Sequence, residues 1–160
     1  ELDIICIILG ESTSSRLYQN LIEKQPEQIF NMANAEHYQF KDGNNFFIQA
    51  NFKPEKKEIA IELIKKEIAN LLNNKISEEE LEKAKKKIKS RFAFAAETVS
   101  EIGETIGYYM TVCEDLKLIE NYLKDLEDIT IEDLESTIKK YLSINNAVIS
   151  ILEPENSSVA

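Results

Sequence analysis

Residues 14–24 read SSRLYQNLIEK, and this stretch lies between an apolar run at residues 4–9 and a segment rich in aromatic residues that begins at Phe30. Leu17 and Leu21 lie four positions apart, so on a helix they share one face. Ser14 or Ser15 can cap that helix, because a hydroxyl oxygen accepts hydrogen bonds from the free N–H groups of the first turn. The stretch therefore predicts a short helix with an apolar inner face, which ends before Pro26.

The segment that precedes this helix is entirely apolar from Ile4 to Leu9 and stops at Gly10. Its periodicity fits either a buried strand or a buried helix. Its β-branched residues favour a strand.

A β-hairpin is predicted after the helix. Residues 30–40 are predicted as a strand in which Phe30, Met32, Tyr38 and Phe40 share one parity, although Asn34 and Glu36 interrupt it. Residues 41–44 form a turn in which Gly43 can adopt a positive φ. The next run alternates between apolar and mainly polar positions, and the apolar positions of one parity are Phe46, Ile48, Ala50 and Phe52. This period of two predicts one buried and one polar face.

Helices are predicted for most of the remaining chain. Pro54 suits the first position of a helix whose apolar stripe runs from Ile59 to Leu72. Ser77 and Glu80 form a capping box for the next helix. Its inner stripe is expected to be Leu81, Ala84, Ile88, Phe92 and Ala95, with the five lysines of residues 83–89 mostly on the solvated face.

The last third is predicted as three further helices and one strand. Residues 97–115 continue helical, and Gly103 and Gly107 are expected to pack closely against another element. Residues 116–126 form a short helix. A helix capped by Thr130 places Leu134, Ile138 and Tyr141 inside, residues 147–152 form a closing strand that ends at Pro154, and residues 155–160 form a frayed tail.

This order of elements predicts an α+β fold. Helices should pack on one face of an antiparallel or mixed sheet, in a single domain of residues 1–160. The net charge of −10 disfavours nucleic acid as a partner, because phosphate binding requires a basic face. The longest apolar run is too short for membrane insertion, which favours a soluble protein. Cys6 and Cys113 are expected to be free, buried thiols.

The residues by themselves indicate no active site. A zinc site needs three or four converging ligands, and His37 is the only histidine, while Glu36 should point to the opposite face of the strand. Ser14 and Ser15 are better explained as capping residues than as nucleophiles, because His37 lies far away on the hairpin. Acidic residues 78–80 fall in a first helical turn, where they complement the helix dipole. We therefore predict no catalytic and no metal-binding residue.

Four segments resemble the C-terminal half of pitrilysin/insulinase-type zinc metallopeptidases, the processing-peptidase-like inverzincins. The family motifs are S-S-R-L-Y-x-x-L-R-E-K, an F-x-D-G hairpin, I-S-x-x-E-L-x-x-A-K and I-T-x-E-D-L…Y-L. The matching segments are residues 14–24, 41–43, 76–85 and 129–142, in the family's order and spacing. The resemblance favours a buried helix for residues 4–9.

The resemblance also implies where substrate-binding residues would be found. In many members the C-terminal half supplies an arginine and, seven residues later, a tyrosine that hold the substrate. The corresponding positions here are Ile22 and Ile29, which cannot donate hydrogen bonds to an oxyanion. These two positions are expected near the end of the second helix and the start of the hairpin, on the inner wall of the chamber.

The resemblance therefore predicts a non-catalytic C-terminal domain of a zinc-dependent protease, a fragment of a longer protein that is inactive alone. It would close the substrate chamber around a peptide, contact the N-terminal half of the same protein, and dock a homologous subunit or a second copy. Zinc would belong to that N-terminal half. The alternative is a scaffold or assembly subunit that is inactive throughout.

Overall fold

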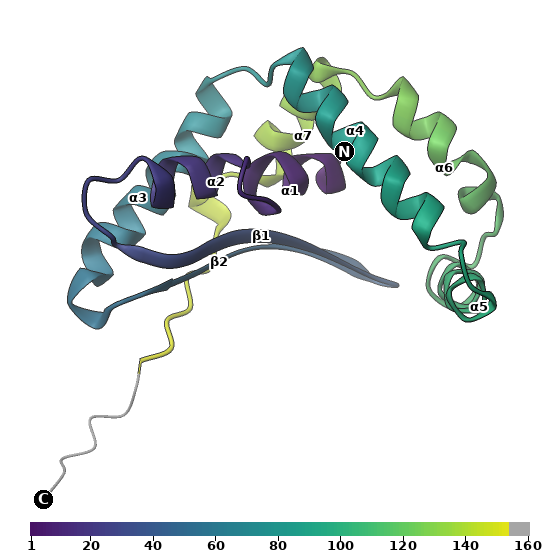
Figure 1. Ribbon diagram of the computed structural model, residues 1–160, viewed down its shortest axis with the longest axis horizontal. Coiled ribbons are helices and arrows are strands. Elements are labelled where there is room, and N and C mark those ends of the chain that lie inside the picture. The colour runs from purple at the N-terminus through teal and green to yellow at the C-terminus, as the bar shows by residue number, and fades with distance from the viewer. Residues whose placement is uncertain (154–160) are drawn as a thin grey trace, which may run out of the picture.

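The computed structural model describes residues 1–153, and its centre is a two-stranded antiparallel hairpin covered on one face by helices (Figure 1). The N-terminal elements are α1 (Leu2–Gly10), α2 (Arg16–Tyr18) with its continuing π-helical turn η1 (Gln19–Glu23), β1 (Phe30–Phe40) and β2 (Gly43–Phe52). The later elements are the 3₁₀ turn η2 (Pro54–Lys56), α3 (Lys57–Asn73), α4 (Glu78–Phe94), α5 (Val99–Tyr108), the π-helical turn η3 (Tyr109–Cys113), α6 (Lys117–Asp128), α7 (Ile131–Tyr141) and the 3₁₀ turn η4 (Ile144–Asn146). The predicted α+β class is confirmed.

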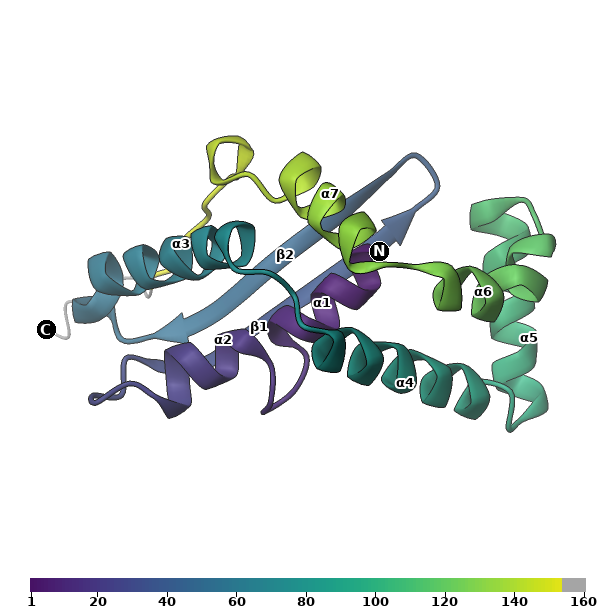
Figure 2. The ribbon, with the colours of Figure 1, turned by 90° about the horizontal axis from the view of Figure 1, so that it is seen from above.

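Helix α1 is the centre of the core. It contacts β1, α4 and α7, and every residue from Ile4 to Leu9 is buried. Figure 2 shows α1 lying over the hairpin, with α3 and α7 to one side and α4 leading away to α5 and α6. A helix that is buried on all sides can be apolar around its whole circumference. The family resemblance therefore predicted the right element, and the β-branched composition pointed to the wrong one.

The closest approach of α1 to the hairpin is at Gly10. A β-carbon at this position would lie 2.1 Å from the backbone nitrogen of Ala35 and 2.7 Å from its Cβ. The sequence predicted the end of the helix here, but not this contact. Gly10 is required because the two backbones leave no room for a side chain.

The hairpin has the predicted strands, and the inner face of β2 is confirmed. The apolar parity of β1 did not mark its buried face, because Met32, Tyr38 and Phe40 are exposed and the register irregularity between Phe30 and Met32 leaves only Phe30 of this set in the core. Ala33 pairs with Ala50 and Ala35 pairs with Ile48, and these side chains face the helices. The turn is tighter than predicted, because β2 begins at Gly43. Gly43 does not adopt a positive φ, so the expected use of its conformational freedom was wrong.

The capping boxes confirm two predicted helix starts. Ser77 and Thr130 each accept a hydrogen bond from the third helical N–H, while Glu80 and Asp133 bond back to the cap backbone. Thr98 forms a third box, which begins α5, so the helix predicted for residues 97–115 is observed over residues 99–113 as α5 and η3.

Several predicted inner positions are exposed instead. Ile59, Ala95 and Tyr141 lie outside the core because each sits at a helix end, past the surface that the helix covers. The expected close packing of Gly103 and Gly107 was also wrong among the described residues, because nothing lies within 4 Å of a β-carbon built at either position.

The predicted closing strand is not formed in the described part of the chain. Residues 147–152 are extended but pair with no strand, and Val148 and Leu152 are 94% and 99% exposed. A strand requires a neighbour that completes its hydrogen-bond ladder, and this segment leads away from the hairpin (Figure 1). Pro154 and the tail at residues 155–160 lie outside the described residues.

Candidate functional site

The stretch that carries the family resemblance is joined to α4 by an ion pair. Arg16 Nε and Nη2 donate to the two carboxylate oxygens of Glu80 at 2.7 and 2.8 Å, and Nη2 also donates to the carbonyl oxygen of Lys75 at 3.1 Å. Burial would raise the pKa of Glu80, but hydrogen bonds from Arg16 and Ser77 outweigh it and lower the pKa to about 2. Arg16 therefore serves to connect two helices.

The serines beside Arg16 have no catalytic geometry. Ser15 occupies the N-cap position of α2, but its side chain makes no capping bond and its Oγ donates instead to the carbonyl oxygen of Ser12 at 2.5 Å. Ser14 Oγ accepts from Lys83 Nζ at 2.6 Å. Both serines are thus occupied by local contacts, and neither faces a histidine.

Ile22 and Ile29 lie where the resemblance places them, in η1 and immediately before β1. Ile29 is 6% exposed and belongs to the core, and Ile22 packs against the core from its edge. Their surroundings within this chain are apolar, so these two positions provide no donor for a substrate oxygen.

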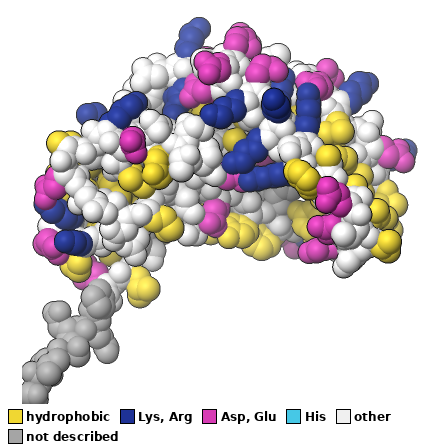
Figure 3. Space-filling model, in the orientation of Figure 1, with side chains coloured by type: hydrophobic (Ala, Val, Ile, Leu, Met, Phe, Trp, Pro, Cys, Tyr) yellow, Lys and Arg dark blue, Asp and Glu magenta, His cyan; other side chains and the backbone are white. Residues whose placement is uncertain are grey.

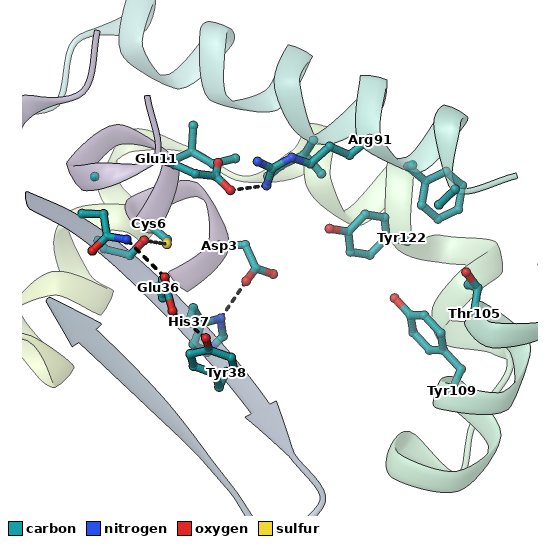
Figure 4. A pocket seen from close by; sticks show the side chains of 17 residues that line it. Asp3, Cys6, Glu11, Glu36, His37, Tyr38, Arg91, Thr105, Tyr109 and Tyr122 are labelled. Carbon is teal, nitrogen blue, oxygen red and sulfur yellow. Dashed lines mark hydrogen bonds and ion pairs between the residues drawn. The ribbon is translucent and has the colours of Figure 1, made fainter. Parts of the chain in front are cut away.

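A cleft of about 630 Å³ opens between α1, β1, α4 and the α5–α6 region. Its polar side chains come from two segments that are far apart in the sequence, as Figure 4 shows. They are Asp3, Glu11, Glu36, His37, Arg91, Tyr109 and Tyr122. Glu11 pairs with Arg91 across the cleft and lies 3.4 Å from Lys87 Nζ. Only the packing of α1 against α4 and β1 brings these residues together, so no local sequence motif could have indicated the cleft.

His37 is held by α1 within this cleft. Its Nδ1 lies 2.6 Å from Asp3 Oδ1, and its side chain is 4% exposed. Nε2 is buried and lacks a hydrogen-bond partner among the described residues. Because a carboxylate only accepts, the contact with Asp3 places a proton on Nδ1.

The residues of the cleft do not fit a zinc ion. Zinc requires at least three protein ligands, and residues 1–153 contain no group of three histidine, cysteine or acidic side chains that could hold a metal. His37 and Asp3 contact each other, and no third ligand joins them.

The cleft also lacks an activated nucleophile. Burial raises the pKa of Cys6 to about 12, so this thiol stays protonated at neutral pH and is unreactive. Its Sγ donates to the carbonyl oxygen of Ala35 at 3.1 Å. Burial likewise raises the pKa of Tyr122 to about 12. Cys6 is a free, buried thiol as expected, whereas Cys113 is only partly buried.

The sequence of this chain matches a known protein family. The family described as the peptidase M16 inactive domain matches residues 1–88, which contain α1, α2, the hairpin, α3 and most of α4. This chain belongs to the peptidase M16 inactive-domain family.

Two similar proteins from Rickettsia are described as uncharacterized zinc proteases. A Rickettsia bellii protein described as an uncharacterized zinc protease is 26% identical over 155 residues, which are 97% of this chain and 37% of that protein. This chain therefore spans little more than a third of that relative.

No helix within residues 1–153 is long and apolar enough to cross a membrane.

Two solved structures share the fold. A protease from Helicobacter pylori is 26% identical with a TM-score of 0.76, and the match covers 89% of this chain and 34% of that one. An inactive peptidase domain from Bordetella parapertussis is 20% identical with a TM-score of 0.81, covering 91% of this chain and 78% of that one. The α+β fold is thus that of the M16 inactive domains.

Proposed function

We propose that this chain is the non-catalytic C-terminal domain of a zinc-dependent protease. It closes a peptide-holding chamber against the N-terminal half of the same protein, which carries the zinc, and it docks a partner subunit. The observation that carries this proposal is an apolar helical face that the fold leaves uncovered.

This uncovered face lies on α5 and η3. Val99, Ile102, Ile106 and Met110 recur at helical spacing, and they are between 41% and 88% exposed. Gly103 and Gly107 lie on the same side of the helix. Figure 3 shows hydrophobic side chains gathered where α5 lies, whereas charged side chains crowd the upper, helical side.

An apolar helical face that contains glycines is suited to packing against a helix of another polypeptide segment. Glycines in a helix allow another backbone to approach closely and otherwise cost about 1 kcal/mol each. Apolar patches of this kind mark interfaces in soluble proteins. The occupant we propose is the N-terminal half, because this chain accounts for 37% of the length of its Rickettsia relative.

A second surface supports the same proposal. A groove of about 1340 Å³ lies between β2, α3 and residues 141–153, and partly buried apolar side chains such as Ile48 and Ile64 line it. Both strands of the hairpin retain a free edge among the described residues. Additional polypeptide is expected to cover this groove in the whole protein.

The test is association with the polypeptide encoded upstream of Glu1 in the same gene. The two purified parts should form a complex in sedimentation velocity, and Ile106→Glu should weaken it at least tenfold, because it would bury a charge in an apolar interface. Ile59→Glu is the matched control, since Ile59 and Ile106 are 47% and 45% exposed and Ile59 lies on α3. This control should leave the affinity unchanged.

Activity separates the proposal from its alternative. The complex should cleave unfolded peptides in a chelator-sensitive manner, and the chain alone should bind no stoichiometric zinc and cleave nothing. An upstream half that lacks the H-x-x-E-H motif and stays inactive would instead support the scaffold or assembly subunit. Failure of the two parts to associate would refute the chamber-closing role.

A further inference from the structure

His37 carries a hydrogen-bonding atom that no other described residue satisfies. Its side chain is 4% exposed and lines the cleft between α1, β1, α4 and the α5–α6 region. The carboxylate of Asp3 lies 2.6 Å from Nδ1, so in the neutral ring the proton is on Nδ1 and Nε2 is an acceptor. Nε2 is buried and has no partner among residues 1–153. Because a buried acceptor without a donor is unfavourable, a ligand that donates to Nε2 would remove this cost.

The opposite wall of the cleft is aromatic. Tyr122 on α6 stacks on Phe92 on α4, with ring centroids 5.3 Å apart. Figure 4 shows the hydroxyl groups of Tyr109 and Tyr122 directed to the side of the cleft that holds Asp3. Burial and, to a smaller extent, the negative charge of Asp3 raise the pKa of Tyr122 to about 12, so this ring stays neutral beside the carboxylate. Neutral aromatic rings next to a carboxylate attract organic cations.

The charges around the cleft also favour a cation. Among the described residues that line it, three of the four charged side chains are acidic, namely Asp3, Glu11 and Glu36. The fourth is Arg91, which is paired with Glu11. Within residues 1–153, neither Asp3 nor Glu36 pairs with a lysine or an arginine. A cation that carries an N–H group would supply both the missing donor and the missing positive charge.

We propose that this cleft binds a small organic cation, an alkylammonium or an alkylguanidinium. An N–H group of the ligand donates to His37 Nε2, Asp3 and Glu36 attract its positive charge, and its carbon chain contacts Tyr122 and Phe92. The cleft volume of about 630 Å³ is within the range of small-molecule sites. The proposal does not depend on the chamber-closing role, which concerns the α5 face and the groove beside β2.

The test is a nuclear magnetic resonance titration of the isotopically labelled 160-residue chain with n-butylguanidinium. The cation should shift the backbone signals of His37 and Tyr122. It should also shift the side-chain Nε2 signal of His37, because a donated hydrogen bond changes the shielding of that nitrogen. n-Butylurea has a similar shape and N–H groups but no charge, and it should bind at least tenfold more weakly. Equal affinities for the two probes, or shifts confined to residues outside the cleft, would overturn the proposal.

A pair of variants tests the charge. Asp3→Asn keeps the side-chain size and an oxygen that accepts from His37 Nδ1, and it should weaken binding of n-butylguanidinium about fivefold because one negative charge is lost. Glu62→Gln is the control, because it removes the same charge from α3, where Glu62 is 71% exposed and does not line the cleft. Equal affinities of these two variants for the cation would contradict the proposed site.

A second variant tests the hydrogen bond separately from the charge. His37→Phe keeps a planar ring and removes Nε2, so it should weaken binding of n-butylguanidinium at least threefold. Tetramethylammonium has no N–H group, and its affinity should not change in this variant. An equal loss for both cations would refute donation to Nε2. Binding of a blocked arginine peptide without any binding of n-butylguanidinium would also overturn the proposal, because the cleft would then require a polypeptide.

Discussion

At the level of single residues, Gly10 is the glycine at which a side chain would meet the backbone of another element. The overlap that a β-carbon would have with Ala35 involves backbone atoms, which cannot move aside as a flexible side chain can. We expect Gly10→Ala to destabilise the chain by about 3 kcal/mol or to prevent folding, because α1 must separate from β1. Urea denaturation followed by circular dichroism measures this.

Gly103→Ala is the control for that prediction. No atom lies within 4 Å of a β-carbon built at Gly103, which is in the middle of α5. Alanine there should leave global stability unchanged or raise it by up to about 1 kcal/mol. If both alanine variants were as stable as the parent chain, the close approach at Gly10 would be refuted.

The lowered pKa of Glu80 predicts that the free energy of unfolding depends on pH. Its pKa is lowered from 4.5 to about 2 in the folded chain, so the ionised form stabilises the folded state fully above the unfolded pKa. This contribution, about 2 kcal/mol after allowance for solvent screening, should be lost as the pH falls from 4.5 towards 2. The difference in free energy of unfolding between the parent chain and Glu80→Gln should therefore shrink over that range.

Glu79→Gln is the matched control, since Glu79 is exposed on the same helical turn. Its effect on stability should be small at pH 7 and at pH 3. A Glu80→Gln variant whose deficit did not change between these pH values would show that Arg16 and Ser77 do not favour the ionised carboxylate.

At the level of elements, the same capping box should have different consequences in two helices. Thr98 and Thr130 both accept from the third helical N–H at 3.2 Å. Helix α7 buries Leu134 and Ile138, whereas α5 buries no residue. Thr130→Ala should therefore lower global stability by about 1 kcal/mol.

Thr98→Ala should change global stability by less than half that amount. It should instead increase hydrogen exchange within α5, because a helix without buried contacts opens locally. Hydrogen-exchange mass spectrometry of the two variants resolves this. An equal global loss in both would show that α5 unfolds together with the core.

The elements themselves differ in how far the sequence could predict them. The hairpin and the boxes at Ser77 and Thr130 were predictable because their signals are local: alternation within one strand, and polar residues three positions apart. The closing strand at residues 147–152 was not, because a strand depends on a partner elsewhere in the chain or outside it.

At the level of the whole molecule, the helices and the hairpin leave two kinds of surface open. The α5 face is apolar and contains glycines, which suits packing against another part of the protein. The outward face of the hairpin carries Met32, Tyr38 and Phe47, each more than 40% exposed, and no helix covers it in Figure 1.

The sequence by itself determined the family, the α+β class, the hairpin and the helix starts at Ser77 and Thr130, because all of these depend on residue order over short spans. It also placed Ile22 and Ile29 where the family has substrate-binding residues. The tertiary structure decided that every residue from Ile4 to Leu9 is buried, that Gly10 admits no side chain, and that Asp3 holds His37. These outcomes depend on which distant segments pack together, and contacts between distant segments have no local signature.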